Sequence, residues 1–184
     1  MQYKLFAEGS IYTPRVELQK PTLPGAWACI ITDTRNQTLN ELCLAEMTTT
    51  HHRIELKAVV NGLNLIKIYS DDAENHVQIC SHSSQVFGAI LTSLPEKSRA
   101  HFLNESTFRQ RLLNQANKAD QTSDMDLRKS LTRLLGSFLN VTFVDITHGS
   151  EPSEHRRCHA LAAQARLQLT LTLGYTVRGM STKC

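Results

Sequence analysis

The order of its apolar runs is the feature that most limits what this chain can fold into. Three strand-like runs come first, at Tyr3 to Ala7, Ala26 to Thr32 and Leu39 to Met47. The second is continuously apolar, as in a strand buried on both faces, and the third is mixed, as in a strand at a sheet edge. Helical and strand-like segments then alternate. This order predicts an α/β domain with a mixed sheet and helices packed against it.

Capping signals and apolar spacing locate the later elements. Thr48, Thr49 and Thr50 offer N-cap hydroxyls before a helix over residues 53–68, and Ser83 or Ser84 offers the cap of a second helix that ends at residue 94. Further elements expected on the same grounds are strands at 77–80 and 141–146, and helices at 126–138 and 154–169.

Length and composition favour one domain over the whole chain, residues 1–184. With 41% hydrophobic residues the chain can bury a core. The segment 12–25 is rich in Pro, Thr and Gly and predicts a loop. Residues 95–123 are polar and predict an inserted basic, helical protrusion, and residues 174–184 form a C-terminal tail. A net charge of +3 is compatible with nucleic acid but does not require it.

The cysteines and the absence of long apolar runs indicate in which cellular compartment the protein is expected. The five cysteines include no CxxC pair, and three of them lie in strand-like runs, so we interpret them as reduced thiols. No apolar run approaches the roughly 20 residues that cross a bilayer. We therefore expect a soluble, cytoplasmic protein with no membrane partner.

Four short strings carry the chemistry. Glu8 precedes Gly9-Ser10 at the end of the first strand, and Glu55 lies at the start of the first helix. The third string, residues 80–86, contains Ser83-Ser84-Gln85 after a strand. The fourth runs from His148-Gly149 through Arg157-Cys158-His159 into the last helix.

Together, and in this order, these strings resemble bacterial ribonuclease HI over nearly the whole chain. The resemblance implies a ribonuclease H-like fold: a five-stranded mixed sheet in the order 3-2-1-4-5 with helices on both faces. It also implies four carboxylates around two divalent metal ions, which activate water for the hydrolysis of a phosphodiester.

Transferred position by position, the four carboxylates of that family fall on Glu8, Glu55, Ser83 and His159, and a histidine loop falls on His148. Only the first two positions still carry a carboxylate. Mg²⁺ requires hard oxygen ligands, so we expect no intact catalytic site, no ribonuclease H activity and no cofactor. Glu8 and Glu55 are either remnants or ligands of a single residual cation.

An active enzyme with a rearranged site is the alternative. It would need Mg²⁺ or Mn²⁺ and a replacement ligand, for which the candidates are Asp71, Asp72 and Glu151. A zinc cluster of His148, His155, Cys158 and His159 matches no standard structural spacing, and we interpret these residues as loop histidines plus a buried cysteine.

Candidate nucleic-acid contacts come from two regions that the resemblance places near the substrate. The candidates are His51, His52, Arg53 and Ser84 beside the site, and Arg109, Arg111 and Lys118 in the insert. A polar first helical turn and a solvated helical face explain the same residues without a ligand, and the insert contains no tryptophan.

Our leading hypothesis is therefore an inactive ribonuclease H-like domain that acts by binding. Its partner would be an RNA–DNA hybrid or RNA, or the protein subunits of a larger nucleoprotein complex of bacterial or mobile-element origin. A third hypothesis is a protein–protein module that docks through the 95–123 insert.

Overall fold

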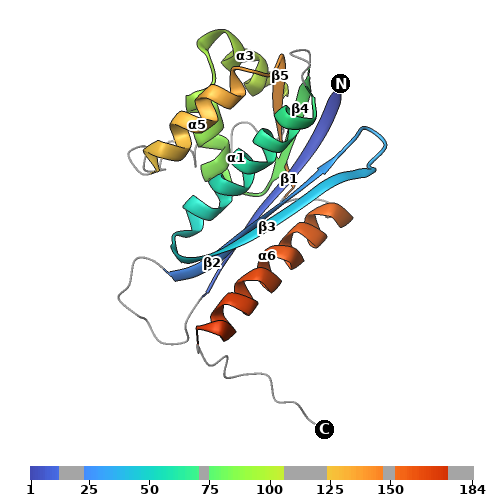
Figure 1. The fold of residues 1–184 in the computed structure, drawn as a ribbon. Helices are drawn as coiled ribbons and strands as arrows, with labels where there is room; N and C mark the ends of the chain where they lie inside the picture. Colours follow the sequence, from blue (N-terminus) through green and yellow to red (C-terminus); the bar gives the residue numbers. More distant parts are fainter. Residues whose placement is uncertain (13–22, 71–74, 106–123, 147–151, 174–184) are drawn as a thin grey trace.

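The computed structural model of the chain describes residues 1–12, 23–70, 75–105, 124–146 and 152–173 (Figure 1). Its strands form one five-stranded sheet in the order β3-β2-β1-β4-β5. The strands are β1 (Gln2–Ile11), β2 (Leu23–Thr32), β3 (Thr38–Thr49), β4 (His76–Ser81) and β5 (Asn140–Asp145). β1, β2 and β3 pair antiparallel, whereas β4 runs parallel to both β1 and β5. The predicted mixed sheet and its strand order are confirmed.

Helices cover both faces of this sheet, as predicted. Of the described helices, α1 (His51–Tyr69), α2 (Ser84–Ser93), α3 (Glu96–Glu105) and α5 (Met125–Leu135) lie on one face, and α6 (Ser153–Thr172) lies on the other (Figure 1). Two buried clusters result, a large one beneath α1 and its neighbours and a small one beneath α6. The candidate site described below lies on the central strand β1, where residues from both helical layers meet.

The helix caps follow the local sequence. Thr50 precedes α1 in an extended conformation, and its hydroxyl accepts a hydrogen bond from the Arg53 backbone N–H at 3.2 Å. Ser83 does the same for α2 through the N–H of Val86, also at 3.2 Å. Both caps satisfy helical N–H groups that would otherwise lack a partner.

The predicted loop over residues 12–25 extends too far, because its last three residues belong to a strand. β2 begins at Leu23, and the strand therefore includes Pro24 and Gly25. Pro24 lacks an N–H, but its carbonyl accepts from the Tyr12 N–H at 2.8 Å, and the pairing with β3 shifts register between Leu23 and Gly25. A proline is tolerated at the start of a strand and at such an irregularity.

The segment 95–123, expected to protrude, begins as part of the core. Phe102 of α3 is fully buried and stacks on Phe87 of α2, with the ring centroids 5.2 Å apart. Residues 106–123, which hold Arg109, Arg111 and Lys118, lie outside the described residues, as do His148 and the predicted tail at 174–184. Within the described helices, none combines the length and apolar character needed to cross a membrane.

A close approach of α1 to the sheet at Gly62 generates a stability prediction. A Cβ added at Gly62 of α1 would lie 2.3 Å from Cδ1 of Leu5, a fully buried side chain of β1. Gly62→Ala should therefore destabilise the fold by about 1–3 kcal/mol through overpacking, against a gain of about 1 kcal/mol from helix propensity.

Urea unfolding measures the effect, with Lys67→Ala, at an exposed position of the same helix, as the control. In the Leu5→Ala/Gly62→Ala double variant the loss should be smaller than the sum of the two single losses. A Gly62→Ala protein as stable as the parent would show that α1 moves away from β1 without cost.

Candidate functional site

Five elements meet at the site. Glu8 projects from β1, Glu55 comes from the second turn of α1, and Ser83 is the N-cap of α2. His82 lies between β4 and α2, and His155 lies in the first turn of α6, on the opposite face of the sheet. Residues far apart in the sequence thus converge near the end of β1.

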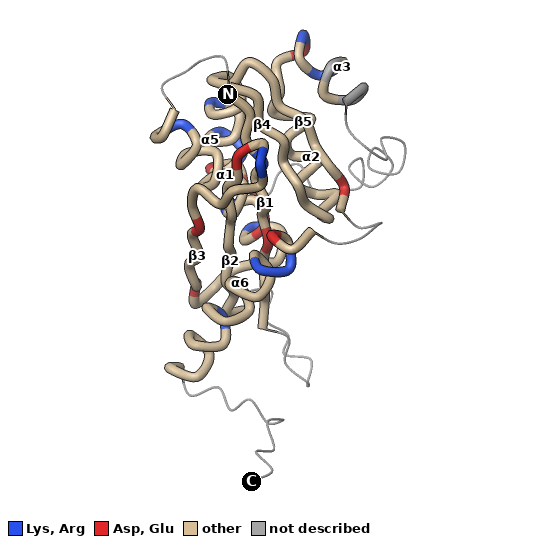
Figure 2. The backbone as a smooth tube through the Cα atoms, turned by 90° about the vertical axis from the view of Figure 1, so that its right-hand side faces the viewer, with Lys and Arg blue, Asp and Glu red and all other residues tan. Residues whose placement is uncertain are grey.

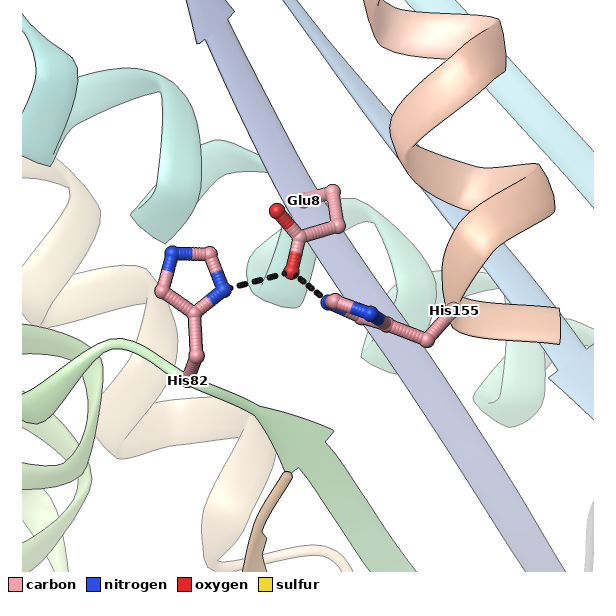
Figure 3. Close-up of side chains that lie close together, drawn as sticks. All are labelled: Glu8, His82 and His155. Carbon is pink, nitrogen blue, oxygen red and sulfur yellow. Dashed lines mark hydrogen bonds and ion pairs between the residues drawn. The ribbon is translucent and has the colours of Figure 1, made fainter. Parts of the chain in front are cut away.

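Glu8 is the centre of the arrangement (Figure 3). One of its carboxylate oxygens, Oε1, lies 3.0 Å from Nδ1 of His82 and in closer contact still with Nε2 of His155. The two imidazole rings are nearly perpendicular, with their centroids 5.9 Å apart. Glu8 is 1% exposed, and its second oxygen, Oε2, is buried without a hydrogen-bond partner among the described residues.

A second carboxylate, Glu55, lies behind His82. Ser83 Oγ donates to Glu55 Oε2 at 2.8 Å, and His51 Nδ1 lies 3.2 Å from Glu55 Oε1. His82 Nε2 lies 3.9 Å from the same Oε1. His82 therefore bridges the two glutamates, with one ring nitrogen directed at each.

The ionisation of these groups is coupled. Burial alone would raise the pKa of Glu8, but the hydrogen bonds from His155 and His82 outweigh burial and lower that pKa below its ordinary value. The hydrogen bond to Glu8 raises the pKa of His82 to about 8, although burial opposes the shift. At neutral pH the site thus holds an ionised Glu8 beside a mainly protonated His82.

Asp145, at the end of β5, adds a third acidic group. It pairs in register with Ser81 of β4 and is 4% exposed. Its charge contributes, after those of Glu8 and Glu55, to the raised pKa of His82. Asp145 was not among the residues selected from the sequence, since nothing in its local string distinguishes it from an ordinary strand-end aspartate.

The structure brings together three of the four residues expected from the resemblance: Glu8, Glu55 and Ser83. His159 lies elsewhere, exposed on α6. Helical geometry explains this placement, because the buried stripe of α6 includes His155, Cys158 and Ala162, at intervals of three and four residues. The imidazole beside Glu8 is therefore that of His155, one turn before His159.

The Cys158 side chain faces the sheet and not the group of ionisable residues around Glu8. Its Sγ lies 3.2 Å from the carbonyl oxygen of Ala28, and burial raises the pKa of its thiol. A buried thiol with a raised pKa is a poor metal ligand. His148, the remaining member of the zinc cluster considered above, lies outside the described residues.

The candidate nucleic-acid residues differ in how accessible they are. Arg53 contacts Asp124 at 2.9 Å and Asp126 at 2.7 Å, and His52 Nδ1 lies 3.1 Å from Asp124. These contacts tie the start of α1 to the start of α5.

By contrast, the His51 side chain is 56% exposed, and Ser84 is half-buried in the first turn of α2. Figure 2 shows the lysines and arginines of the described backbone scattered among acidic residues.

Of the comparisons with known proteins, the one with solved structures bears on the fold. No family model and no curated protein matches the sequence. Among solved structures, the N-terminal ribonuclease H domain of a Mycobacterium tuberculosis protein superposes with a TM-score of 0.62 at 13% identity, over 94% of this chain and 98% of that chain. Ribonuclease H1 of the archaeon Halobacterium salinarum gives 0.55 at 16% identity, over 91% and 99%.

A third structure, LC11-RNase H1 from a compost metagenome in complex with an RNA/DNA hybrid, gives a TM-score of 0.56 at 15% identity, over 91% and 98%. The foamy viral protease–reverse transcriptase, also with an RNA/DNA hybrid, gives 0.61 at 12% identity, over 90% of this chain and 20% of that one. At these identities the likeness establishes architecture: the chain has a ribonuclease H-like fold.

The residues present do not fit the pair of Mg²⁺ ions that the ribonuclease H resemblance implies. Mg²⁺ binds oxygen ligands in near-octahedral geometry and keeps much of its hydration. Here two imidazoles contact one oxygen of Glu8, and the Ser83 hydroxyl donates a hydrogen bond to Glu55. Among the residues that the structure describes, a cluster in which two imidazoles contact the central carboxylate does not offer the set of oxygens that two such ions need.

The raised pKa of His82 predicts how stability depends on pH in metal-free buffer. Glu8, Glu55 and Asp145 favour protonated His82 in the folded state, so this contribution is complete below pH 6.5 and is lost as the pH rises through about 8. Since the His82 side chain is 42% exposed, solvent screening should keep the loss below about 1 kcal/mol.

Urea unfolding between pH 6 and 9 measures the loss. His82→Gln should flatten the decline, whereas His76→Gln, at an exposed histidine near the opposite end of β4, should leave it unchanged. An unaltered pH profile in His82→Gln would contradict the ion pairing assigned to His82.

Proposed function

We propose that this chain is a nucleic-acid-binding domain of the ribonuclease H fold that does not hydrolyse its ligand by the two-metal mechanism. The observation that carries the proposal is the engagement of Glu8 by His82 and His155. Its setting would be a larger nucleoprotein assembly of bacterial or mobile-element origin.

Loss of hydrolysis is supported by the charge of the site. Two-metal hydrolysis needs ligands that place two cations on either side of the reacting phosphate. Protonated His82 offsets part of the negative charge of Glu8 and Glu55, and a cation would have to displace protons from the imidazoles before it reached Glu8. Ser83, in the position where the resemblance expects a carboxylate, contributes no charge.

Binding is supported by the surface beside the site. The N-termini of α1 and α2 lie close together, since Ser83 at the start of α2 contacts Glu55 of α1. Neither helix has an acidic residue in its first turn. Helix N-termini favour phosphate through their N–H groups and dipole, and exposed His51 adds a donor there.

The similar solved structures support a ligand class for this proposal. The similar LC11-RNase H1 and foamy viral enzymes were solved with RNA/DNA hybrids, and the viral enzyme also with double-stranded DNA. For the present chain, we propose an RNA–DNA hybrid or an RNA duplex.

Binding is tested by fluorescence anisotropy with a labelled RNA–DNA hybrid and with double-stranded RNA, in chelator and at two salt concentrations. We expect dissociation constants in the micromolar range or tighter at low salt, and weaker binding at higher salt as phosphate contacts are lost. His51→Ala should weaken binding by roughly 3- to 10-fold if its imidazole contacts a phosphate.

His76→Ala is the matched control, since His76 is also exposed but lies near the far end of β4. No binding of either duplex at micromolar protein would overturn the nucleic-acid part of the proposal. In that case only a protein-binding role for the domain would remain.

Hydrolysis is tested separately with labelled hybrid and either Mg²⁺ or Mn²⁺. The parent protein should leave the hybrid intact, as should the Glu55→Gln variant. Cleavage by the parent that disappears in Glu55→Gln would contradict the proposal and establish the alternative, an active metal-dependent ribonuclease H.

A further inference from the structure

The group formed by Glu8, His82 and His155 has a donor set of its own. One carboxylate oxygen and two imidazole nitrogens, from three separate elements, all lie within 4.8 Å of one another. Imidazole nitrogen suits zinc and other late transition metals, whereas Mg²⁺ prefers oxygen alone. Two histidines with one glutamate, plus water, is a ligand set that zinc accepts.

The spacing of these atoms is close to that of a metal site. Zinc–nitrogen and zinc–oxygen bonds of about 2.0–2.2 Å place tetrahedral ligand atoms about 3.3 Å apart. Glu8 Oε1 lies 3.0 Å from His82 Nδ1, and both imidazole nitrogens point at this same oxygen (Figure 3). Small ring rotations would therefore admit an ion in place of the protons that now connect these groups.

A separate observation on Glu8 also points to a ligand. Its second oxygen, Oε2, is buried and has no hydrogen-bond partner among the described residues. A buried, unpartnered carboxylate oxygen is costly. A divalent cation beside Glu8 would compensate that charge directly.

The surroundings of His82 would orient it as a metal ligand. If Nδ1 binds the ion, the Nε2–H faces Glu55 Oε1, now 3.9 Å away. Glu55 is in turn held by Ser83 Oγ and contacted by His51. A carboxylate behind a metal-bound histidine fixes its tautomer and raises its basicity. The partial exposure of His82 leaves access for a water molecule as fourth ligand.

We propose that Glu8, His82 and His155 bind one Zn²⁺ ion, with Glu55 positioning His82 from behind. This inference is independent of nucleic-acid binding, because it rests on ligand geometry alone. It also differs from the metal site that the ribonuclease H resemblance implies, in the number of ions and in the type of donor.

Metal binding is measured on the full chain without nucleic acid. Metal-free protein is titrated with Zn²⁺ against a chromophoric chelator, and with Co²⁺ by visible absorption. We expect one equivalent of Zn²⁺ at micromolar concentration, the intense visible bands of four-coordinate Co²⁺, and no displacement by a roughly thousandfold excess of Mg²⁺. Absence of stoichiometric Zn²⁺ binding would overturn the proposal.

Variants identify the ligands. His82→Ala removes a partly exposed side chain and should lower zinc affinity by about 100-fold or more, while Glu55→Gln should lower it by about 10-fold. Glu8→Gln, checked for folding by circular dichroism, should abolish the cobalt bands. His159→Ala is the matched control, since His159 is exposed on the same helix as His155 and should not change binding.

Zinc binding as tight in His82→Ala as in the parent would place the ion elsewhere and overturn the assignment. The hybrid titration described above is carried out in chelator. The proposals of zinc binding and of nucleic-acid binding are therefore tested independently of each other.

Discussion

The structure depends on keeping a carboxylate ionised inside the fold. Glu8 is 1% exposed on the central strand, where burial alone disfavours its charge, and two imidazoles compensate that cost. His82 reaches Glu8 from the junction of β4 and α2, and His155 reaches it from α6 on the other face of the sheet. One carboxylate thereby ties together both helical layers. Removing the buried His155 would leave Glu8 with a poorly compensated charge, which is among the more costly changes a core can undergo. Loss of His82 should cost less, because its side chain is 42% exposed and solvent screens the charge.

Much of the fold follows from local sequence. Apolar spacing predicted the order of strands and helices, and the caps Thr50 and Ser83 are among the candidates that the sequence offered. Strand order came from the resemblance, because spacing alone does not say which strands pair. The prediction that residues 95–123 protrude was incomplete because it rested on the average composition of the segment. These residues are polar as a group, yet Phe102 among them is fully buried against Phe87. The start of β2 was misplaced because Pro24 signals a loop unless its partner strand is known.

The sequence could predict those site residues whose place at the end of a strand or the start of a helix fixes where they lie. Glu8, Glu55 and Ser83 lie at a strand end, in an early helical turn and at a helix cap, and the structure brings them together. His155 was considered only as a member of a possible zinc cluster and not as a neighbour of Glu8, because the resemblance was anchored on Cys158 and pointed to its neighbour His159. The spacing of His155, Cys158 and Ala162 along one helical face was the signal that could have found it. His82 follows a strand, and the direction of its ring is set by contacts with Glu8 that the sequence does not contain.

Replacement of carboxylates by imidazoles has opposite consequences for catalysis and for binding. A cluster of four carboxylates repels a phosphodiester unless cations occupy it. In such a site the binding of nucleic acid is therefore coupled to the binding of metal ions. In this chain His82, with a pKa of about 8, carries positive charge between Glu8 and Glu55 at neutral pH. The negative potential that would concentrate Mg²⁺ is reduced, and the same reduction lowers the repulsion of a nucleic-acid backbone. Under the proposal above, a ribonuclease H-like fold with this site is expected to bind a duplex without the ions that hydrolysis requires. A bound zinc ion would replace the proton on His82 and would also leave positive charge at this position.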